Sequence, residues 1–171
     1  MIYAGIGSRK TPAFALGIME IIGTLLARQD WTLRSGGAVG ADKAFEKGCD
    51  AAEGKREIFL ASDGDPDWAR KEAEKHIPEN RPPFHTWKPY VQGLIARNMM
   101  QILGRNGDEP VNMVVCWTPA SVKDGGGTGY ALRCATSREI PIYNMHDVSS
   151  LERIRVWLQR GCLEYPDPER P

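Results

Sequence analysis

Apolar and polar positions follow two spacings that alternate along the chain. Short segments rich in apolar residues, typical of buried strands, lie at 1–6, 31–34, 57–60, 111–117 and 140–143. Between them, apolar residues recur every three or four positions, as in helices, at 12–28, 41–48, 67–76, 90–103, 130–137 and 148–160. This alternation predicts an α/β fold: a single Rossmann-like domain whose mostly parallel sheet has helices on both faces.

Two segments refine this prediction. The run at 111–117 is the most apolar strand, so we expect it at the centre of the sheet. Residues 77–89 contain four prolines and no periodicity, which predicts an extended surface connection. No repeat or linker divides the chain, so we expect one Rossmann-like domain over 1–160 and a proline-rich tail over 161–171.

Composition narrows the range of partners. Lys and Arg total 22, as do Asp and Glu, so the formal net charge is zero. Binding to nucleic acid depends strongly on a positive electrostatic field, so a net charge of zero weighs against a nucleic-acid partner. A basic groove on one part of the surface is compatible with this net charge. No apolar run approaches the roughly 20 residues of a membrane span, and the first residues lack a signal-peptide pattern. We therefore expect a cytoplasmic protein with no membrane partner.

The cysteines and histidines give no metal-binding spacing. Four cysteines and three histidines are dispersed, and no CxxC pair occurs. Dispersed cysteines in such a chain are typical of buried thiols, so we expect no metal site and no cofactor. The residues concerned are Cys49, Cys116, Cys134, Cys162, His76, His85 and His146.

Three predicted strands each run into a glycine-rich loop that precedes a predicted helix. The carboxyl ends of parallel strands share one edge of a sheet, where ligands bind. Glycine lets backbone N–H groups approach a phosphate, and a helix N-terminus adds unpaired donors and a positive dipole end. A single such loop often only reverses the chain, but three together favour a phosphate site. The candidate residues are Gly5, Gly7, Ser8 and Arg9 in the first loop, Ser35, Gly36, Gly37, Ala38 and Gly40 in the second, and Gly125, Gly126, Gly127 and Thr128 in the third.

Several side chains near these loops have both a ligand-binding and a structural interpretation. Arg9 suits a phosphate but equally a surface ion pair, and Asp42 suits a ribose hydroxyl or a helix N-terminus. The pair Arg97–Asn98 lies in a helix whose other residues face the core, so it needs a partner, either a ligand or an ion pair. Trp117 ends a strand at the ligand edge, where it would stack on a base or close the core. Ser8, Ser35 and Thr128 suit both helix caps and phosphate donors.

These motifs together resemble the SLOG superfamily, which includes the DprA/Smf DNA-processing proteins and the Lonely Guy phosphoribohydrolases. The matching segments are YAGIGSR at 3–9, LRSGGAVGAD at 33–42, ARNMMQIL at 96–103 and GGGTGYAL at 125–132, in the family's order. The resemblance spans roughly 1–145 and is strongest to small stand-alone phage members. It implies a Rossmann-like fold, a nucleotide-derived ligand and, in many members, dimerisation through helices, so we expect a homodimer.

The catalytic pair of the Lonely Guy enzymes carries over only in part. Arg97 matches their arginine, but Tyr130 and Ala131 stand where the motif implies a glutamate. Without a carboxylate, cleavage of an N-glycosidic bond lacks its main agent. Glu20, Asp42 or Asp124 remain as substitutes, and no catalytic residue is assigned.

Three functions follow in order of preference. The first is binding of a nucleotide-derived small molecule; for a phage protein in a host cytoplasm, this would fit sequestration of a nucleotide immune signal such as a cyclic ADP-ribose isomer. The second is a nucleotide-processing hydrolase that cleaves an N-glycoside or phosphoester. The third is binding of single-stranded DNA as in DprA.

Overall fold

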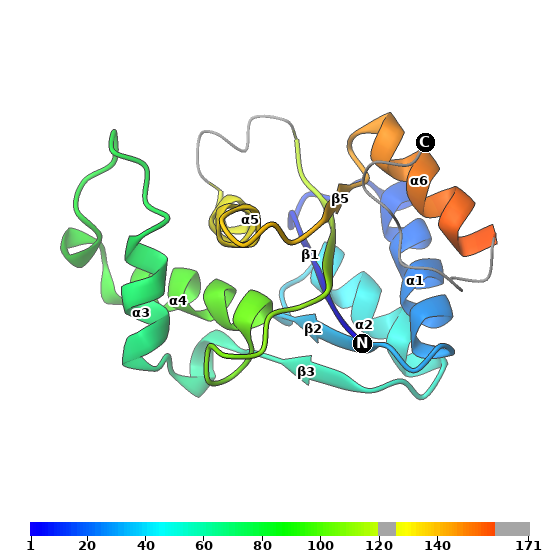
Figure 1. The fold of residues 1–171 in the computed structure, drawn as a ribbon, viewed down its shortest axis with the longest axis horizontal. Helices are drawn as coiled ribbons and strands as arrows, with labels where there is room; N and C mark the ends of the chain where they lie inside the picture. The colour runs from blue at the N-terminus through cyan, green and yellow to red at the C-terminus, as the bar shows by residue number, and fades with distance from the viewer. Residues whose placement is uncertain (120–125, 160–171) are drawn as a thin grey trace.

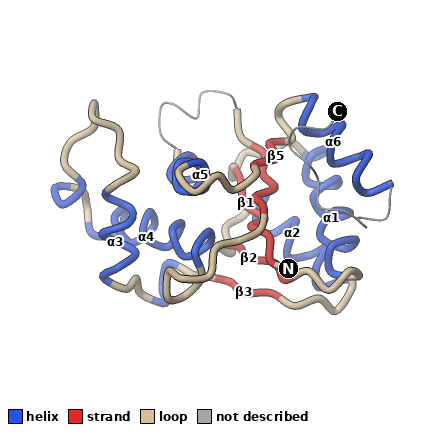
Figure 2. The backbone as a smooth tube through the Cα atoms, in the orientation of Figure 1, coloured by secondary structure: helices blue, strands red, loops and turns tan. Residues whose placement is uncertain are grey.

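Five short parallel strands form one sheet in the order β3-β2-β1-β4-β5 (Figures 1 and 2). The computed structural model describes residues 1–119 and 126–159. The strands are β1 (Ile2–Gly7), β2 (Thr32–Ser35), β3 (Arg56–Ile58), β4 (Met113–Trp117) and β5 (Ile142–Asn144). The predicted α/β class and Rossmann-like architecture are confirmed.

Helices cover both faces of the sheet, on the left and right of Figure 1, and the sheet separates two apolar cores. One core joins the sheet to α3, α4 and α5, and the other joins it to α1, α2 and α6. The helices are α1 (Ala13–Ala27), α2 (Ala41–Ala51), α3 (Asp67–Glu74), α4 (Pro89–Leu103), α5 (Gly127–Thr136) and α6 (Val148–Gln159), with short 3-10 turns η1 (Ala61–Asp63) and η2 (Phe84–Thr86). No helix in 1–119 or 126–159 is long and apolar enough to cross a membrane.

Two expectations about elements need correction. β1, not β4, lies at the centre of the sheet, although β4 is paired on both sides. Both strands are almost fully buried, so apolar content could not rank them. The connection at 77–89 is also not simply extended, because it contains η2 and buries the Phe84 ring against the core.

Helices α1 and α2 touch through glycine backbones. A Cβ placed on Gly48 would lie 2.0 Å from the carbonyl oxygen of Glu20, and one placed on Gly23 would lie 2.7 Å from that of Phe45. These distances are far below van der Waals contact, so neither position tolerates a side chain without moving a helix. The glycines therefore fix how closely the two helices approach each other.

The interior also holds the buried cation Arg34. The Arg34 guanidinium is 1% exposed and donates from Nε to Glu57 at 2.5 Å and from Nη2 to Glu109. Its Nη1 donates to the backbone carbonyl of Glu109. Arg34 thus joins β2 to β3 and to the segment that leads into β4.

Three cysteines, Cys49, Cys116 and Cys134, are buried free thiols, as expected. Burial raises the pKa of the Cys116 thiol to about 12, so that thiol is unreactive near neutral pH. Although the cysteines and histidines are dispersed along the sequence, the fold places His76 beside Cys134. Cys162 and the predicted tail over 161–171 lie outside the described residues.

Candidate nucleotide-binding cleft

A cleft of about 810 Å³ opens at the carboxyl ends of β1 and β4. The two strands pair along their whole length, and the Ser8 amide extends the pairing by donating to the Trp117 carbonyl at 3.1 Å. The chain leaves β1 towards α1 on one face and β4 towards α5 on the other. Such a switch point is where open α/β sheets hold their ligands.

All three glycine-rich loops reach this cleft. The first loop contributes Gly7, Ser8 and Arg9, and the second contributes Ala38 together with Asp42 of α2. The third contributes Gly126, Gly127 and Thr128, the start of α5. Gly125, also predicted for the third loop, lies outside the described residues. Segments that are distant in sequence therefore converge on one cavity, the geometry that a phosphate site requires.

Six predicted residues do not line the cleft. Gly5 lies beneath Leu33 and Phe45, and the Ser35 hydroxyl donates to the Gly5 carbonyl at 2.7 Å, so both are internal. Trp117 points to the opposite face of the sheet, and its ring lies 5.2 Å from that of His146. Its strand position reaches the ligand edge, but its side chain does not. The remaining three are Gly36, Gly37 and Gly40.

These three glycines shape the second loop instead. Gly37 and Gly40 have φ angles of +69° and +91°, which favour glycine. A Cβ on Gly40 would lie 2.7 Å from the Ser8 carbonyl, so the first and second loops touch there. Gly36 accepts a hydrogen bond through its carbonyl from Arg97. Their role in the structure is to bring the loops together.

The Arg97–Asn98 pair finds its partners in two of the loops. Arg97 Nη1 donates to the Gly36 carbonyl at 2.6 Å, and Asn98 Nδ2 donates to the Gly127 carbonyl at 2.7 Å. Arg97 Nη2 also donates to Asn98 Oδ1 at 3.0 Å, which couples the two side chains. Both residues line the cleft. Their hydrogen bonds connect α4 to the second and third loops, and the Arg97 guanidinium forms part of the cavity wall.

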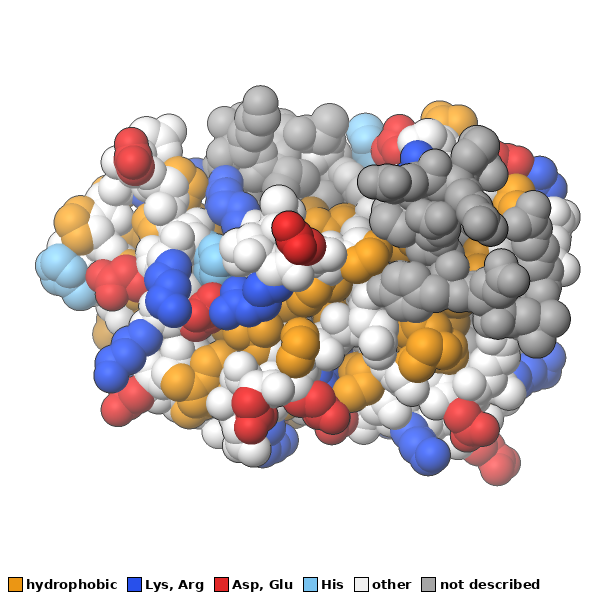
Figure 3. Space-filling view, viewed as in Figure 1, with side chains coloured by type: hydrophobic (Ala, Val, Ile, Leu, Met, Phe, Trp, Pro, Cys, Tyr) orange, Lys and Arg blue, Asp and Glu red, His pale blue; other side chains and the backbone are white. Residues whose placement is uncertain are grey.

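The described lining of the cleft is strongly basic. It carries four cations, Arg9, Lys10, Arg81 and Arg97, and one carboxyl group, Asp42. Arg9 and Lys10 are exposed, and neither side chain has an ion pair within the described part of the chain. Elsewhere, acidic and basic side chains are interspersed, as on the face shown in Figure 3. A neutral protein therefore concentrates positive charge at one site.

Asp42 is buried at the second position of α2, with 4% exposure. Burial raises the pKa of its carboxyl group to about 6, and the nearby Arg97 charge and the Ala38 and Gly36 amides only partly oppose this shift. Its Oδ2 accepts from the Ala38 amide at 3.3 Å. Asp42 therefore supports the second loop as a helix-terminal acid and also presents a titratable group to the cleft.

Sequence reasoning missed an entire wall of this cleft. Arg81, Pro82 and Trp87 come from the proline-rich connection, and Gln101 and Tyr130 come from α4 and α5. Trp87 donates from its ring nitrogen to the Pro82 carbonyl at 2.9 Å and packs edge-on against Tyr130. An arginine and a tryptophan in an otherwise aperiodic segment were the available signal.

Comparison with known proteins supports the fold. The chain is similar to DNA processing protein A from Helicobacter pylori, with a TM-score of 0.55 and 16% sequence identity over 83% of this chain and 63% of that one. That structure was described for its unique single-stranded DNA binding mode. No protein-family model matches, and no curated protein matches. At this identity the likeness shows a DprA-type Rossmann-like fold, and this chain spans less than two thirds of its neighbour's length.

The expectation that weighed against nucleic acid needs correction. The structural neighbour binds single-stranded DNA, which conflicts with it. The physical error was to infer the local field from the net charge. A formal charge of zero for the whole chain coexists with four cations around one cleft.

Proposed function

We propose that this cleft binds a nucleotide-type ligand through its phosphate. The observation that supports this most is the meeting of Arg9, Lys10 and Arg97 with the start of α5 in one cavity. A phosphate there accepts hydrogen bonds from guanidinium forks and from helix N-terminal amides. The half-buried Trp87 ring and its neighbour Tyr130 supply an apolar wall suited to a base.

A binding panel tests this proposal. Inorganic phosphate, AMP, ADP, NAD and ADP-ribose are titrated into the protein by calorimetry, and ligand carried through purification is identified by mass spectrometry after denaturation. Replacing Arg9 by alanine is expected to weaken the tightest ligand about ten- to a hundredfold, because an exposed cation that bonds the phosphate is lost.

Arg28→Ala is the matched control for Arg9→Ala. Arg28 is also exposed, but it follows α1 at the end far from the cleft. Its replacement should leave binding unchanged. Equal losses in both variants, or no binding by any member of the panel, would contradict a specific phosphate site.

Single-stranded DNA is a second candidate, supported by the basic lining of the cleft and by the DNA-binding structural neighbour. Arg9, Lys10 and Arg81 provide cations for successive phosphates, and Trp87 provides a ring on which a base stacks. With three phosphates neutralised, the slope of log affinity against log salt is about −2 for a labelled oligothymidylate. A free nucleotide that binds tightly while the oligonucleotide does not would exclude this candidate.

A hydrolase is the third candidate, and of the possible catalytic carboxyl groups the structure favours Asp42. Of the three substitutes for the missing glutamate, Glu20 pairs with Lys47 away from the cleft and Asp124 lies outside the described residues. Asp42 lines the cleft near Arg97 with a pKa of about 6, close to what a general acid or base needs. Released base or sugar phosphate that disappears in Asp42→Asn, with no loss of ligand affinity, would establish this activity.

Asp42 also predicts a pH dependence of binding. Below its pKa of about 6 the carboxyl group is neutral, and above it a negative charge enters the cleft. Affinity for an anion should therefore fall about three- to tenfold between pH 5 and pH 7. The thymidine dinucleotide dTpT suits this measurement, because its phosphodiester does not titrate in that range, and Asp42→Asn should give a flat profile. A slope that persists in this variant would assign the effect to another group.

Sequestration of a nucleotide signal by a phage protein in a host cytoplasm extends the same proposal. Release of intact ligand on denaturation supports sequestration, whereas multiple turnover contradicts it.

A further inference from the structure

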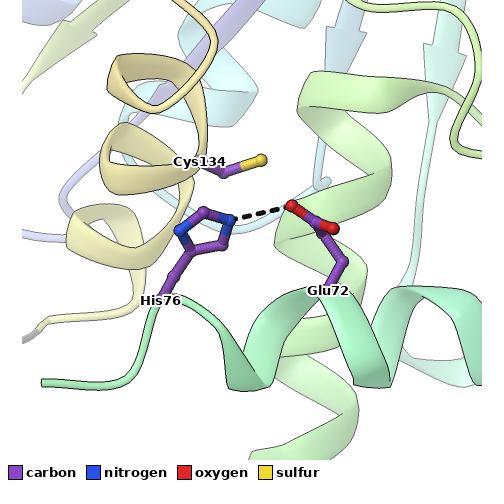
Figure 4. A group of neighbouring side chains, drawn as sticks. All are labelled: Glu72, His76 and Cys134. Atoms are coloured by element: carbon purple, nitrogen blue, oxygen red, sulfur yellow. Dashed lines mark hydrogen bonds and ion pairs between the residues drawn. The ribbon is translucent and has the colours of Figure 1, made fainter. Parts of the chain in front are cut away.

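Three side chains of metal-ligating types meet between α3 and α5, away from the cleft (Figure 4). Glu72 lies on α3, His76 lies one helical turn later, just past the end of that helix, and Cys134 faces them from α5. Their potential ligand atoms all lie within 4.8 Å of one another. The imidazole Nε2 is 3.0 Å from Glu72 Oε1, and all three residues are buried.

We propose that Glu72, His76 and Cys134 form a zinc(II) site. Zinc accepts a carboxylate oxygen, an imidazole nitrogen and a thiolate sulfur together, and four-coordinate geometry leaves one position for water. On binding, the thiol S–H bond breaks, a Zn–S bond forms and the proton leaves to solvent. This inference does not depend on the function proposed for the cleft.

Two cationic side chains, Arg138 and Lys75, already bind the proposed ligand atoms and would compete with zinc for them. Arg138 donates to Glu72 Oε1 at 2.6 Å and to the Cys134 sulfur at 3.4 Å, and Lys75 donates to Glu72 Oε2 at 2.8 Å. The Arg138 and Lys75 side chains are 32% and 67% exposed, so both can withdraw into water. The carboxylate and the thiolate then balance the two charges of the ion. Zinc and the two cations therefore compete for the same ligand atoms.

Metal titration tests the site in the whole 171-residue chain. Zinc is titrated against a chelating dye, and cobalt(II) is added separately to observe a thiolate-to-metal charge-transfer band. Cys134→Ser and His76→Gln should each weaken zinc binding at least about 100-fold and abolish the band. Cys49→Ala removes a different buried thiol and should change neither result. Circular dichroism checks that each variant is folded.

Arg138→Ala provides a test in the opposite direction. Removing the competing cation should tighten zinc binding about two- to fivefold, the range expected for a partly exposed ion pair. Zinc binding elsewhere on the chain would not respond to this change. The proposal is overturned if the wild-type protein shows no stoichiometric zinc binding, if binding survives in folded Cys134→Ser, or if Arg138→Ala leaves the affinity unchanged.

Discussion

Replacing both Glu57 and Glu109 by alanine is expected to lower the free energy of unfolding by about 3 kcal/mol. The Arg34 side chain is only 1% exposed, so losing both carboxylates leaves a buried guanidinium with the Glu109 carbonyl as its remaining acceptor. Arg34→Met should lower the free energy of unfolding by roughly half that amount or less. The acids it releases are 46% and 64% exposed and return to water.

Urea denaturation of the two variants measures this asymmetry. Glu152→Ala is the control, because Glu152 belongs to an exposed ion pair on α6 and should leave the unfolding midpoint unchanged. An equal or larger loss in Arg34→Met than in the double variant would show that packing around the arginine, rather than its charge, governs stability here.

Arg97→Ala is expected to weaken ligand binding at least about 100-fold, the largest effect of any single change in the cleft. It removes a cation from the cavity wall and releases the Gly36 carbonyl, to which Arg97 donates at 2.6 Å. It also removes a positive charge that lowers the pKa of buried Asp42, so that pKa should rise above its present value of about 6. Loop geometry, phosphate contact and local charge therefore change together.

Arg97→Lys separates these contributions. The lysine keeps the charge but loses the planar fork that bonds both Gly36 and Asn98. An intermediate loss is expected by calorimetry, and Arg105→Ala, which follows α4 outside the cleft, should bind normally. If folded Arg97→Ala retained full affinity, the ligand would have to lie elsewhere.

Much of the fold and part of the site could be predicted because they depend on local patterns. Alternating apolar runs and helical periodicity gave the α/β class, and parallel strands dictate that loops following them share one edge. Gly7, Ser8 and Arg9 line the cleft, and their role in binding stays a prediction. Side-chain direction was harder to predict: Trp117 stands at the correct edge but points to the other face.

The remaining features depend on contacts between segments distant in sequence. Arg81 and Trp87 lie in a segment without periodicity, and their residue types alone did not indicate that this segment folds against the cleft. The proximity of His76 to Cys134 could not be predicted either, because it depends on how α3 and α5, which are distant in sequence, pack against each other. Net charge failed as a guide because it averages over positions that the fold separates.

The glycine contact between α1 and α2 has a consequence for how the protein adapts to its ligand. With Gly23 and Gly48 in backbone contact, the first two strand–helix units should move as one rigid body. The part of the cleft formed by Ser8 and Arg9 belongs to that rigid body, so its geometry should stay the same whichever anion it binds. On the proposed function, differences in the size and shape of the group attached to the phosphate fall on the other side of the cavity, at Trp87 and its segment. Discrimination among nucleotides is then expected to depend on that wall, while the part formed by Ser8 and Arg9 is common to all of them.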